Sequence, residues 1–516
     1  MRGARRSIRI LIIGAGPGGI CAAKELKEAG FNDVVLLEKT AGVGGTWNIN
    51  RYPGCACDVQ CHLYSFSFAI KPDWSRPYPP QAEILAYMED LAATYGVLDH
   101  CRFGTEVVRA AWDDTTATWR LDLSDGDVVE ADVLISALGM FKEPTPPVID
   151  GLGGFTGTMF HSSRWRFDHD LTGRTVGVIG SAASAVQFVP EIAKTAGHVY
   201  LFQRTANWVL PKPDTPYTEE QLEEFRRDPG IVRRMRDEIY RSMDEGMTFS
   251  DPAVLAEREA IGLAAIDVVE DGDTRAKLRP DHPFGCKRPL FSNLYYQAFN
   301  RPNLELVTEP IDRVNPDGIL TVDGVERRVD TLVLATGFTT TRYASAIDIV
   351  GRHGRTLAEA WSDGAHAYLG IVTAGFPNLF MIYGPNTNNG SILTMIESQV
   401  AHIVAQVERM AGESLAWVDV TSEAEAAYNH DVQQAIGGVA VWQAACNGYY
   451  RTPSGRVVTQ WPFSMSEFRD RTAVVDTAAF AVGVRSVEPV VAMTSVIGAE
   501  VDHDDGRPSP ASRGAE

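Results

Sequence analysis

Residues 8–19 read IRILIIGAGPGG, an apolar run that ends in glycines at the spacing G-x-G-x-x-G. The run predicts a short buried β-strand over residues 8–13, and the glycines predict a tight turn into a helix that ends near Gly30. Gly14 permits the turn, Gly16 lets the backbone approach a pyrophosphate, and Gly19 lets the helix pack closely on the strand. This stretch therefore predicts an α/β unit that binds a dinucleotide.

The acidic residue after the second expected strand indicates which dinucleotide binds. A strand over residues 34–37 ends in Glu38. A carboxylate at this position accepts hydrogen bonds from both ribose hydroxyls and repels a 2′-phosphate. The first site is therefore predicted to hold FAD or NAD rather than NADP.

A second copy of the pattern begins at residues 174–179, RTVGVI, where alanines replace two of the three fingerprint glycines that follow. Its next strand, residues 199–202, ends in Gln203-Arg204-Thr205. Arg204 can pair with a 2′-phosphate, which predicts NADPH at this site. The candidate cofactor-binding residues of the turn are Gly180, Ser181, Ala182, Ser184 and Ala185.

Two sites of opposite 2′ preference predict a bound flavin, FAD, and a diffusing NADPH that passes a hydride to it. We expect an α/β fold with two Rossmann-like dinucleotide-binding domains, in which the NADP domain is inserted in the FAD domain and carries a helical excursion. The expected boundaries are 1–145 and 332–475 for the FAD domain, 150–331 for the NADP domain, 215–265 for the helical excursion, and 500–516 for a disordered tail.

Composition narrows the classes of partner. The chain has 47 Lys and Arg against 67 Asp and Glu, so its formal charge of −20 disfavours nucleic acid or a membrane surface as a partner. Seven cysteines without a dense framework favour a reducing, cytoplasmic location. Cys55, Cys57 and Cys61 lack the spacing of a redox pair or a zinc site, so we expect buried structural thiols and no metal. From the residues alone, the final electron acceptor stays open among a disulfide, a quinone and oxygen.

Two further motifs carry a resemblance to a known family. Residues 155–165, FTGTMFHSSRW, match F-x-G-x-x-x-H-x-x-x-W at Phe155, Gly157, His161 and Trp165. Residues 44–58, GGTWNINRYPGCACD, match a second fingerprint. With residues 335–337 (ATG) and 383–387 (YGPNT), the chain resembles the Baeyer–Villiger monooxygenases, class B flavoprotein monooxygenases, over roughly residues 8 to 465.

The resemblance implies an activity: NADPH reduces FAD, O₂ adds to give a peroxyflavin, and a small-molecule ketone becomes an ester or a lactone. It implies that Arg288 is the catalytic cation and that Asp58 pairs with it, while Lys287 joins Arg204 and Thr205 on the 2′-phosphate. By motif position it also implies cofactor contacts from Thr46, Trp47, Tyr64, Ala56 and Cys57. The motif around His161 and Trp165 lies at the link between domains and is expected to act as a hinge or in packing.

Two other flavoenzyme activities remain alternatives, and the chain differs from the family pattern at two positions. A related flavin monooxygenase would oxidise amine or thioether heteroatoms, although such enzymes usually have Tyr in place of Trp165. An NADPH-dependent flavin reductase would make no stable oxygen adduct. The chain departs from the family pattern at Arg166, where Pro or Asp is usual, and at Tyr449, where relatives commonly have a Trp that contacts the nicotinamide cofactor. Neither the particular ketone nor the oligomeric state has a sequence signal.

Overall fold

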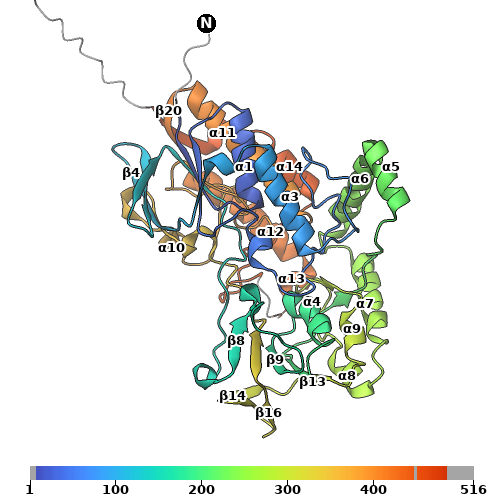
Figure 1. The fold of residues 1–516 in the computed structure, drawn as a ribbon. Helices are drawn as coiled ribbons and strands as arrows, with labels where there is room; N and C mark the ends of the chain where they lie inside the picture. The colour runs from blue at the N-terminus through green and yellow to red at the C-terminus, as the bar shows by residue number, and fades with distance from the viewer. Residues whose placement is uncertain (1–6, 445, 447–449, 485–516) are drawn as a thin grey trace, which may run out of the picture.

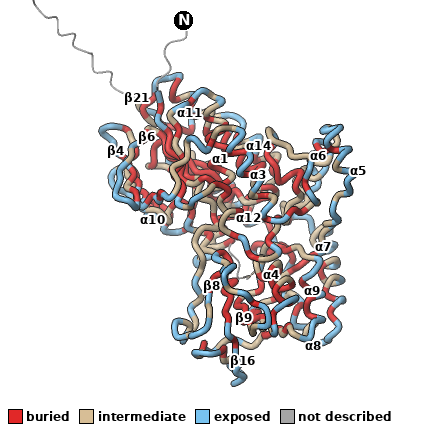
Figure 2. Tube along the Cα trace, viewed as in Figure 1, coloured by how far each residue is buried: buried red, intermediate tan, exposed pale blue. Residues whose placement is uncertain are grey.

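A computed structural model describes residues 7–444, 446 and 450–484. Figure 1 shows two lobes: an upper one built from the beginning and the end of the chain, in blue and orange, and a lower one built from the middle, in green and yellow. Figure 2 shows that buried segments run through the centre of each lobe. The predicted tail, 500–516, lies outside the described residues.

The upper lobe is built on a five-stranded parallel sheet. Its strand order is β19 (Leu379–Met381), β7 (Val133–Ser136), β1 (Ile10–Ile13), β2 (Val34–Glu38), β3 (Cys101–Phe103). Ile10 and Ile12 face one core and Leu11 and Ile13 face another, as expected for a strand with both faces buried. Helices cover the first face, among them α1 (Pro17–Glu28), α3 (Gln81–Thr94) and α11 (Ile392–Gly412).

A small sheet covers the other face of this parallel sheet. Its strands are β18 (Asp348–Val350), β4 (Val107–Asp113), β5 (Thr118–Leu123) and β6 (Val128–Ala131). Trp119 and Leu121 of β5 are buried in the same core as Leu11 and Ile13 of β1. The parallel sheet is therefore enclosed between helices and a second sheet.

The lower lobe repeats this plan. Its parallel sheet has the order β13 (Leu304–Val307), β10 (His198–Phe202), β9 (Thr175–Ile179), β17 (Thr331–Leu334), β8 (Thr158–His161), and α4 (Ala183–Ile192) follows β9 as α1 follows β1. The antiparallel strands β14 (Ile311–Asn315), β15 (Gly318–Thr321) and β16 (Glu326–Arg328) form a separate sheet whose core includes residues of β9 and β10. The α/β class with two Rossmann-like units is confirmed.

Two segments cross side by side between the lobes. The amide of Thr145 donates to the carbonyl of Gly337 at 2.9 Å, and the hydroxyl of Thr336 donates to the carbonyl of Thr145 at 2.6 Å. The amide of Thr339 donates to the carbonyl of Glu143 at 2.9 Å. The chain thus leaves and re-enters the upper lobe at one place.

The expected helical excursion is present, and side-chain caps begin its helices. It comprises α5 (Glu219–Arg227), α6 (Pro229–Gly246) and α7 (Pro252–Ile266), followed by α8 (Gly272–Lys277). Thr218 and Gln221 make a capping box at the start of α5, while the side chains of Asp228 and Asp251 cap α6 and α7, each directly before a proline. In Figure 1, α5 and α6 lie beside the upper lobe, and α7 leads down to the lower one.

The remaining elements are short or close the upper lobe. They are α2 (Thr46–Ile49), β11 (Val209–Leu210), β12 (Leu290–Phe291), α9 (Tyr295–Ala298), α10 (Leu357–Ala360), β20 (Leu415–Val420), α12 (Ser422–Gly438), α13 (Ala440–Gln443), α14 (Met465–Thr472) and β21 (Phe480–Val484). Among the described residues, no helix combines the length and the apolar character needed to cross a membrane. The expected cytoplasmic location stays a prediction.

Candidate active site between the two lobes

A cavity of about 2300 Å³ lies where the lobes meet. Both glycine turns line it, as do the two crossing segments, α6 and residues around Arg288. A single drug-sized ligand occupies roughly 300–1,000 Å³, so this cavity has room for more than one ligand. Of the sequence-predicted cofactor and catalytic residues, Gly19 and Ala185 are the two that do not line it.

The first glycine turn leaves the backbone open to a ligand. Gly14 has φ +104°, and a Cβ there would lie 2.8 Å from the carbonyl oxygen of Ala137. A Cβ on Gly45 would lie 2.8 Å from Cα of Gly16, so side chains are excluded at this close approach. A Cβ on Gly19 would overlap the carbonyl oxygen of Gly14, which agrees with a packing role behind the turn.

Glu38 closes this turn from the end of β2. Its buried carboxylate accepts the Ala15 amide at 2.9 Å and both the amide and the hydroxyl of Thr40 at 2.8 Å. The carboxylate also lines the cavity. It is therefore held in a fixed orientation at the position expected for ribose recognition.

The second turn has the same geometry. Gly180 also has φ +104°, and a Cβ there would lie 2.5 Å from the carbonyl oxygen of Ala335. Ser181, Ala182 and Ser184 follow it on the cavity wall, and Ala185 is fully buried in α4. The turn therefore keeps its conformation although alanines replace two fingerprint glycines.

Three residues that the resemblance assigns to the 2′-phosphate lie together. The ammonium of Lys287 donates to the hydroxyl of Thr205 at 2.9 Å. Burial lowers the pKa of Lys287, Asp281 opposes this effect, and the positive charge of Arg204 adds to it. Two cations and a hydroxyl thus face the cavity, an arrangement that suits a phosphate.

Arg288 and Asp58 form an ion pair on the cavity wall. Nη2 of Arg288 donates to Oδ1 and Oδ2 of Asp58 at 2.7 and 2.5 Å. The Asp58 side chain is 19% exposed and that of Arg288 is 37% exposed, so the guanidinium is held by its partner and still reaches the cavity. A fixed cation that is protonated at every accessible pH can stabilise an anion that forms beside it.

The other residues expected to contact FAD or the nicotinamide also line the cavity. Nε1 of Trp47 donates to the hydroxyl of Tyr64 at 2.9 Å, and their rings meet edge to face at 5.6 Å. Thr46, Ala56 and Cys57 line the same cavity. These residues are brought together, and their contacts with a cofactor stay a prediction.

The fingerprint residues Phe155, Gly157, His161 and Trp165 do not line the cavity. The His161 ring packs at 5.5 Å on Phe338 of the second crossing segment, and Trp165 packs on Phe160 and Phe188. A Cβ on Gly157 would overlap the carbonyl oxygen of Asp330. The motif therefore packs within the lower lobe, and His161 joins it to the crossing segment; the expected hinge role stays a prediction.

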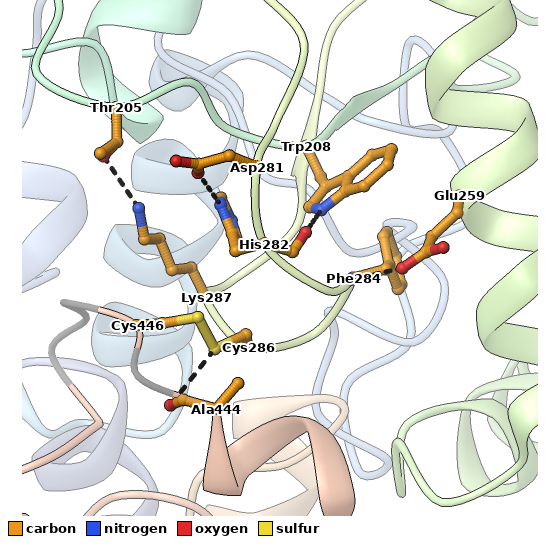
Figure 3. Close-up of a disulfide and its surroundings, with 10 residues drawn as sticks. All are labelled: Thr205, Trp208, Glu259, Asp281, His282, Phe284, Cys286, Lys287, Ala444 and Cys446. Atoms are coloured by element: carbon orange, nitrogen blue, oxygen red, sulfur yellow. Dashed lines mark hydrogen bonds and ion pairs between the residues drawn. A yellow bond between two sulfur atoms is a disulfide. The ribbon is translucent and has the colours of Figure 1, made fainter.

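The cysteines behave in two ways. Cys55, Cys57 and Cys61 are free and buried, and burial raises the pKa of Cys55 to about 12, so its thiol stays protonated at neutral pH. Cys286 and Cys446 instead form a disulfide with a Cα–Cα distance of 6.2 Å (Figure 3). They are 160 positions apart, and no spacing motif pointed to this pair.

Of the two departures from the family pattern, Arg166 and Tyr449, the structure describes the first. Arg166 is exposed, and its guanidinium pairs with the Asp168 carboxylate at 2.9 and 2.5 Å, away from the cavity. Tyr449 lies outside the described residues. The Arg that this chain has at position 166 therefore forms a surface ion pair.

Sequence reasoning missed several cavity residues. Gln187 of α4 joins the lobes, because it accepts the Tyr52 hydroxyl at 3.0 Å and donates to the Ala56 carbonyl at 2.9 Å. An apolar wall had no motif, since it depends on how α6 and α7 pack; it comprises Ile239, Met243, Met247, Phe249, Leu255 and Phe284. Among the residues that the structure describes, no three His, Cys, Asp or Glu side chains are placed to hold a metal ion.

Comparisons with known proteins agree with this arrangement. The family model of pyridine nucleotide-disulphide oxidoreductases matches residues 11–246. A Baeyer–Villiger monooxygenase of Pseudomonas aeruginosa is 39% identical over 485 residues, which cover 92% of each chain. A structure of oxidised steroid monooxygenase bound to NADP superposes with a TM-score of 0.83 at 31% identity, covering 93% of this chain and 100% of that one.

A second solved structure resembles the chain equally well. The OTEMO complex with FAD and NADP has a TM-score of 0.83 at 29% identity, covering 92% of this chain and 99% of that one. Identity above 30% over nine-tenths of both sequences, together with the paired glycine turns, settles the relationship. The chain belongs to the Baeyer–Villiger monooxygenase family of flavoprotein monooxygenases.

Proposed function

We propose that this chain uses FAD, NADPH and O₂ to convert a small-molecule ketone into an ester or a lactone. The observation that carries the proposal is the Arg288–Asp58 ion pair, which lies on the wall of a cavity shared by both glycine turns. A permanent cation beside the reacting groups is what ketone oxidation needs, because an anion forms on the attacking oxidant and then on the carbonyl oxygen.

The first glycine turn fits FAD. Gly14 and Gly16 leave room for a pyrophosphate, since a Cβ at Gly14 or Gly45 would collide with backbone. Glu38 is positioned for the ribose hydroxyls by the Ala15 and Thr40 hydrogen bonds. We assign Thr46, Trp47 and Tyr64 to the same cofactor from the family resemblance, and all three line the cavity.

The second turn fits NADPH. Residues 180–184 supply the approach to the pyrophosphate, and Arg204, Thr205 and Lys287 supply the charge that recognises a 2′-phosphate. We assign Ala56 and Cys57 to the nicotinamide side of the shared cavity.

When bound, NADPH supplies a hydride, and FAD takes it up and activates O₂. The protein's own residues stabilise charge, orient the cation and exclude water. Arg288 holds positive charge where the ketone oxygen gains negative charge, and Asp58 orients the guanidinium. The buried wall around Trp47 and Tyr64 excludes water, which otherwise promotes loss of hydrogen peroxide.

The apolar wall suits the organic part of a ketone. Met243 and Met247 line the cavity beside Phe249 and Phe284, whose side chains are 6% and 5% exposed. Methionine side chains adapt to different shapes, so this wall can accept more than one carbon skeleton. A ketone would thus place its carbonyl at Arg288 and its apolar groups on this wall.

The test is product formation under isotopically heavy O₂. The purified holoenzyme is given NADPH with linear, cyclic and aryl ketones, and products are identified by mass spectrometry. The proposal expects an ester or a lactone that carries one heavy oxygen, and consumption of one NADPH for each product. Stoichiometric hydrogen peroxide with no product across the panel would contradict it, and products from sulfides or amines alone would favour heteroatom oxidation.

A further inference from the structure

The Cys286–Cys446 disulfide lies next to the proposed catalytic cation. Cys286 immediately precedes Lys287 and Arg288 in the chain. Cys446 lines the cavity and follows α13, whose residue Gln443 also lines it. Figure 3 shows the disulfide between Lys287 and Ala444, the residue that follows α13. No sequence motif assigns a role to Cys286 or Cys446.

On one side, residues 282–290, here called the Arg288 segment, are held by hydrogen bonds to the inserted unit. The indole of Trp208 donates to the carbonyl of His282 at 2.9 Å, and the amide of Leu290 donates to the carbonyl of Trp208 at 2.9 Å. The amide of Phe284 donates to Glu259 of α7 at 2.9 Å. The segment is therefore anchored near both of its ends.

An ion pair and a disulfide join the Arg288 segment to the upper lobe. The ion pair is that of Arg288 with Asp58, and the disulfide is that of Cys286 with Cys446, two positions earlier. An ion pair can break and re-form as the guanidinium moves, whereas a disulfide fixes its two Cα atoms at 6.2 Å. The covalent link therefore limits how far the Arg288 segment can move from Cys446.

We propose that Cys286 and Cys446 form a thiol-sensitive tether, which holds Lys287 and Arg288 against the cavity when oxidised and releases them when reduced. The proposal rests on the function proposed above. In the oxidised form, the segment keeps NADP⁺ and the ketone in place together. In the reduced form, the lobes separate more easily, NADP⁺ binds more weakly, and more NADPH is consumed for hydrogen peroxide.

Reduction would loosen the site without unfolding it. The rings of Phe249 and Trp442 lie 6.1 Å apart, and Phe249 also contacts Phe284, so apolar packing between the segments persists without the disulfide. Cys286 is 5% exposed and Cys446 is half-buried, so a reductant reaches the sulfur of Cys446 first. Cys286 is then the leaving thiolate.

The chemistry needs only a thiol and a peroxide. A dithiol attacks the sulfur of Cys446, and its second thiol completes the exchange, which gives two protein thiols and one oxidised dithiol. Hydrogen peroxide reverses the change: one thiolate becomes a sulfenic acid, the other displaces water from it, and the disulfide re-forms with two molecules of water released. Peroxide that escapes from unproductive turnover would thus restore the tether.

The experiment compares the FAD-bound wild-type protein before and after treatment with dithiothreitol, which is then removed without air. Alkylation and peptide mass spectrometry report whether residues 286 and 446 are joined, independently of activity. NADP⁺ affinity is measured by equilibrium dialysis, and hydrogen peroxide per NADPH is measured with a ketone present. We expect NADP⁺ affinity to fall at least about fivefold on reduction, peroxide release to rise, and diamide to reverse both changes.

Two serine variants and one control separate the tether from other thiols. Cys446→Ser should show the reduced-form values without dithiothreitol and should not respond to it, and Cys286→Ser should do the same. Cys101→Ser removes a free, half-buried thiol and should keep the full response of the wild type. A protein whose residues 286 and 446 stay unjoined after diamide, or whose affinity and peroxide yield ignore the thiol state, would refute the tether. Absence of ketone oxidation in both states would instead refute the proposed function.

Discussion

Arg288 and Asp58 lie 230 positions apart in the chain, yet Nη2 of the arginine donates to both carboxylate oxygens at 2.7 and 2.5 Å. The arginine comes from the inserted unit and the aspartate from the loop that follows α2. The pair therefore exists only when the two lobes are together. The position of the cation therefore depends on the contact between the lobes.

Removing the Arg288 guanidinium should stop oxygen transfer and leave flavin reduction intact. We expect Arg288→Ala to lower ketone conversion about 10²- to 10³-fold, since it removes the charge that stabilises the developing anion. NADPH should still bleach the flavin under anaerobic conditions. Arg279→Ala removes an exposed arginine shortly before the same segment and should match the wild type. Normal ketone turnover in Arg288→Ala would disprove the catalytic assignment.

Asp58 should act through Arg288. Asp58→Asn keeps the shape of the side chain but removes its charge, so the guanidinium is less well held, and we expect about tenfold slower ketone conversion. The double variant Asp58→Asn/Arg288→Ala should be no slower than Arg288→Ala alone. Additive losses in this cycle, measured as kcat/KM for the ketone, would show that the two residues act separately.

NADPH selectivity should depend on Arg204 and Lys287. Each charged contact with a phosphate contributes about 1.5–3 kcal/mol, so Arg204→Gln should raise the KM for NADPH about 10- to 100-fold and leave that for NADH nearly unchanged. Lys194→Met, at an exposed lysine that pairs with Glu191 in the same unit, is the matched control. An equal rise in both KM values for Arg204→Gln would place Arg204 away from the 2′-phosphate.

Features that depend on local sequence could be predicted, whereas features that depend on long-range packing could not. The turns at Gly14 and Gly180 were predictable, because a positive φ and a close backbone approach both require glycine. The Arg288–Asp58 pair was found through the family resemblance alone. Gln187 and the Cys286–Cys446 pair had no local signal, since each depends on segments that meet only after the lobes have packed.

Acid should destabilise the fold through His62. This side chain is 1% exposed, and burial lowers its pKa to about 4. The unfolded chain takes up a proton near pH 6.5 while the folded chain does not, so the stability that His62 contributes is complete above about pH 6.5 and is lost as the pH falls towards 4. The loss is on the order of 3 kcal/mol.

A His62→Gln variant tests this assignment. Glutamine can still hydrogen-bond the hydroxyl of Tyr217, which lies 3.2 Å from Nε2 of His62, but it does not titrate. Urea unfolding from pH 7.5 to 4.5 should therefore show a shallower pH dependence in the variant than in the wild type. Parallel curves for the two proteins would mean that other groups cause the acid sensitivity.

A half-buried arginine of the helical excursion holds the upper lobe. Nη1 of Arg236 in α6 donates to three backbone carbonyls, those of His62, Leu63 and Ser65, at 3.0, 3.2 and 2.6 Å. Its Nη2 lies 3.6 Å from Glu397 of α11. The loop it holds also carries Tyr64, and α6 carries Met243 to the cavity.

Replacing this arginine should therefore reduce both stability and substrate affinity. Arg236→Met keeps much of the side-chain volume but removes the donor that the three carbonyls share and the cation beside Glu397, so we expect a loss of about 3 kcal/mol in the free energy of unfolding. The KM for the ketone should rise more than kcat falls, since the α6 wall moves while the Arg288–Asp58 pair stays. Arg233→Met, at an exposed position of the same helix, controls for the substitution itself. Equal KM values for the two variants would show that α6 is positioned by its apolar packing alone.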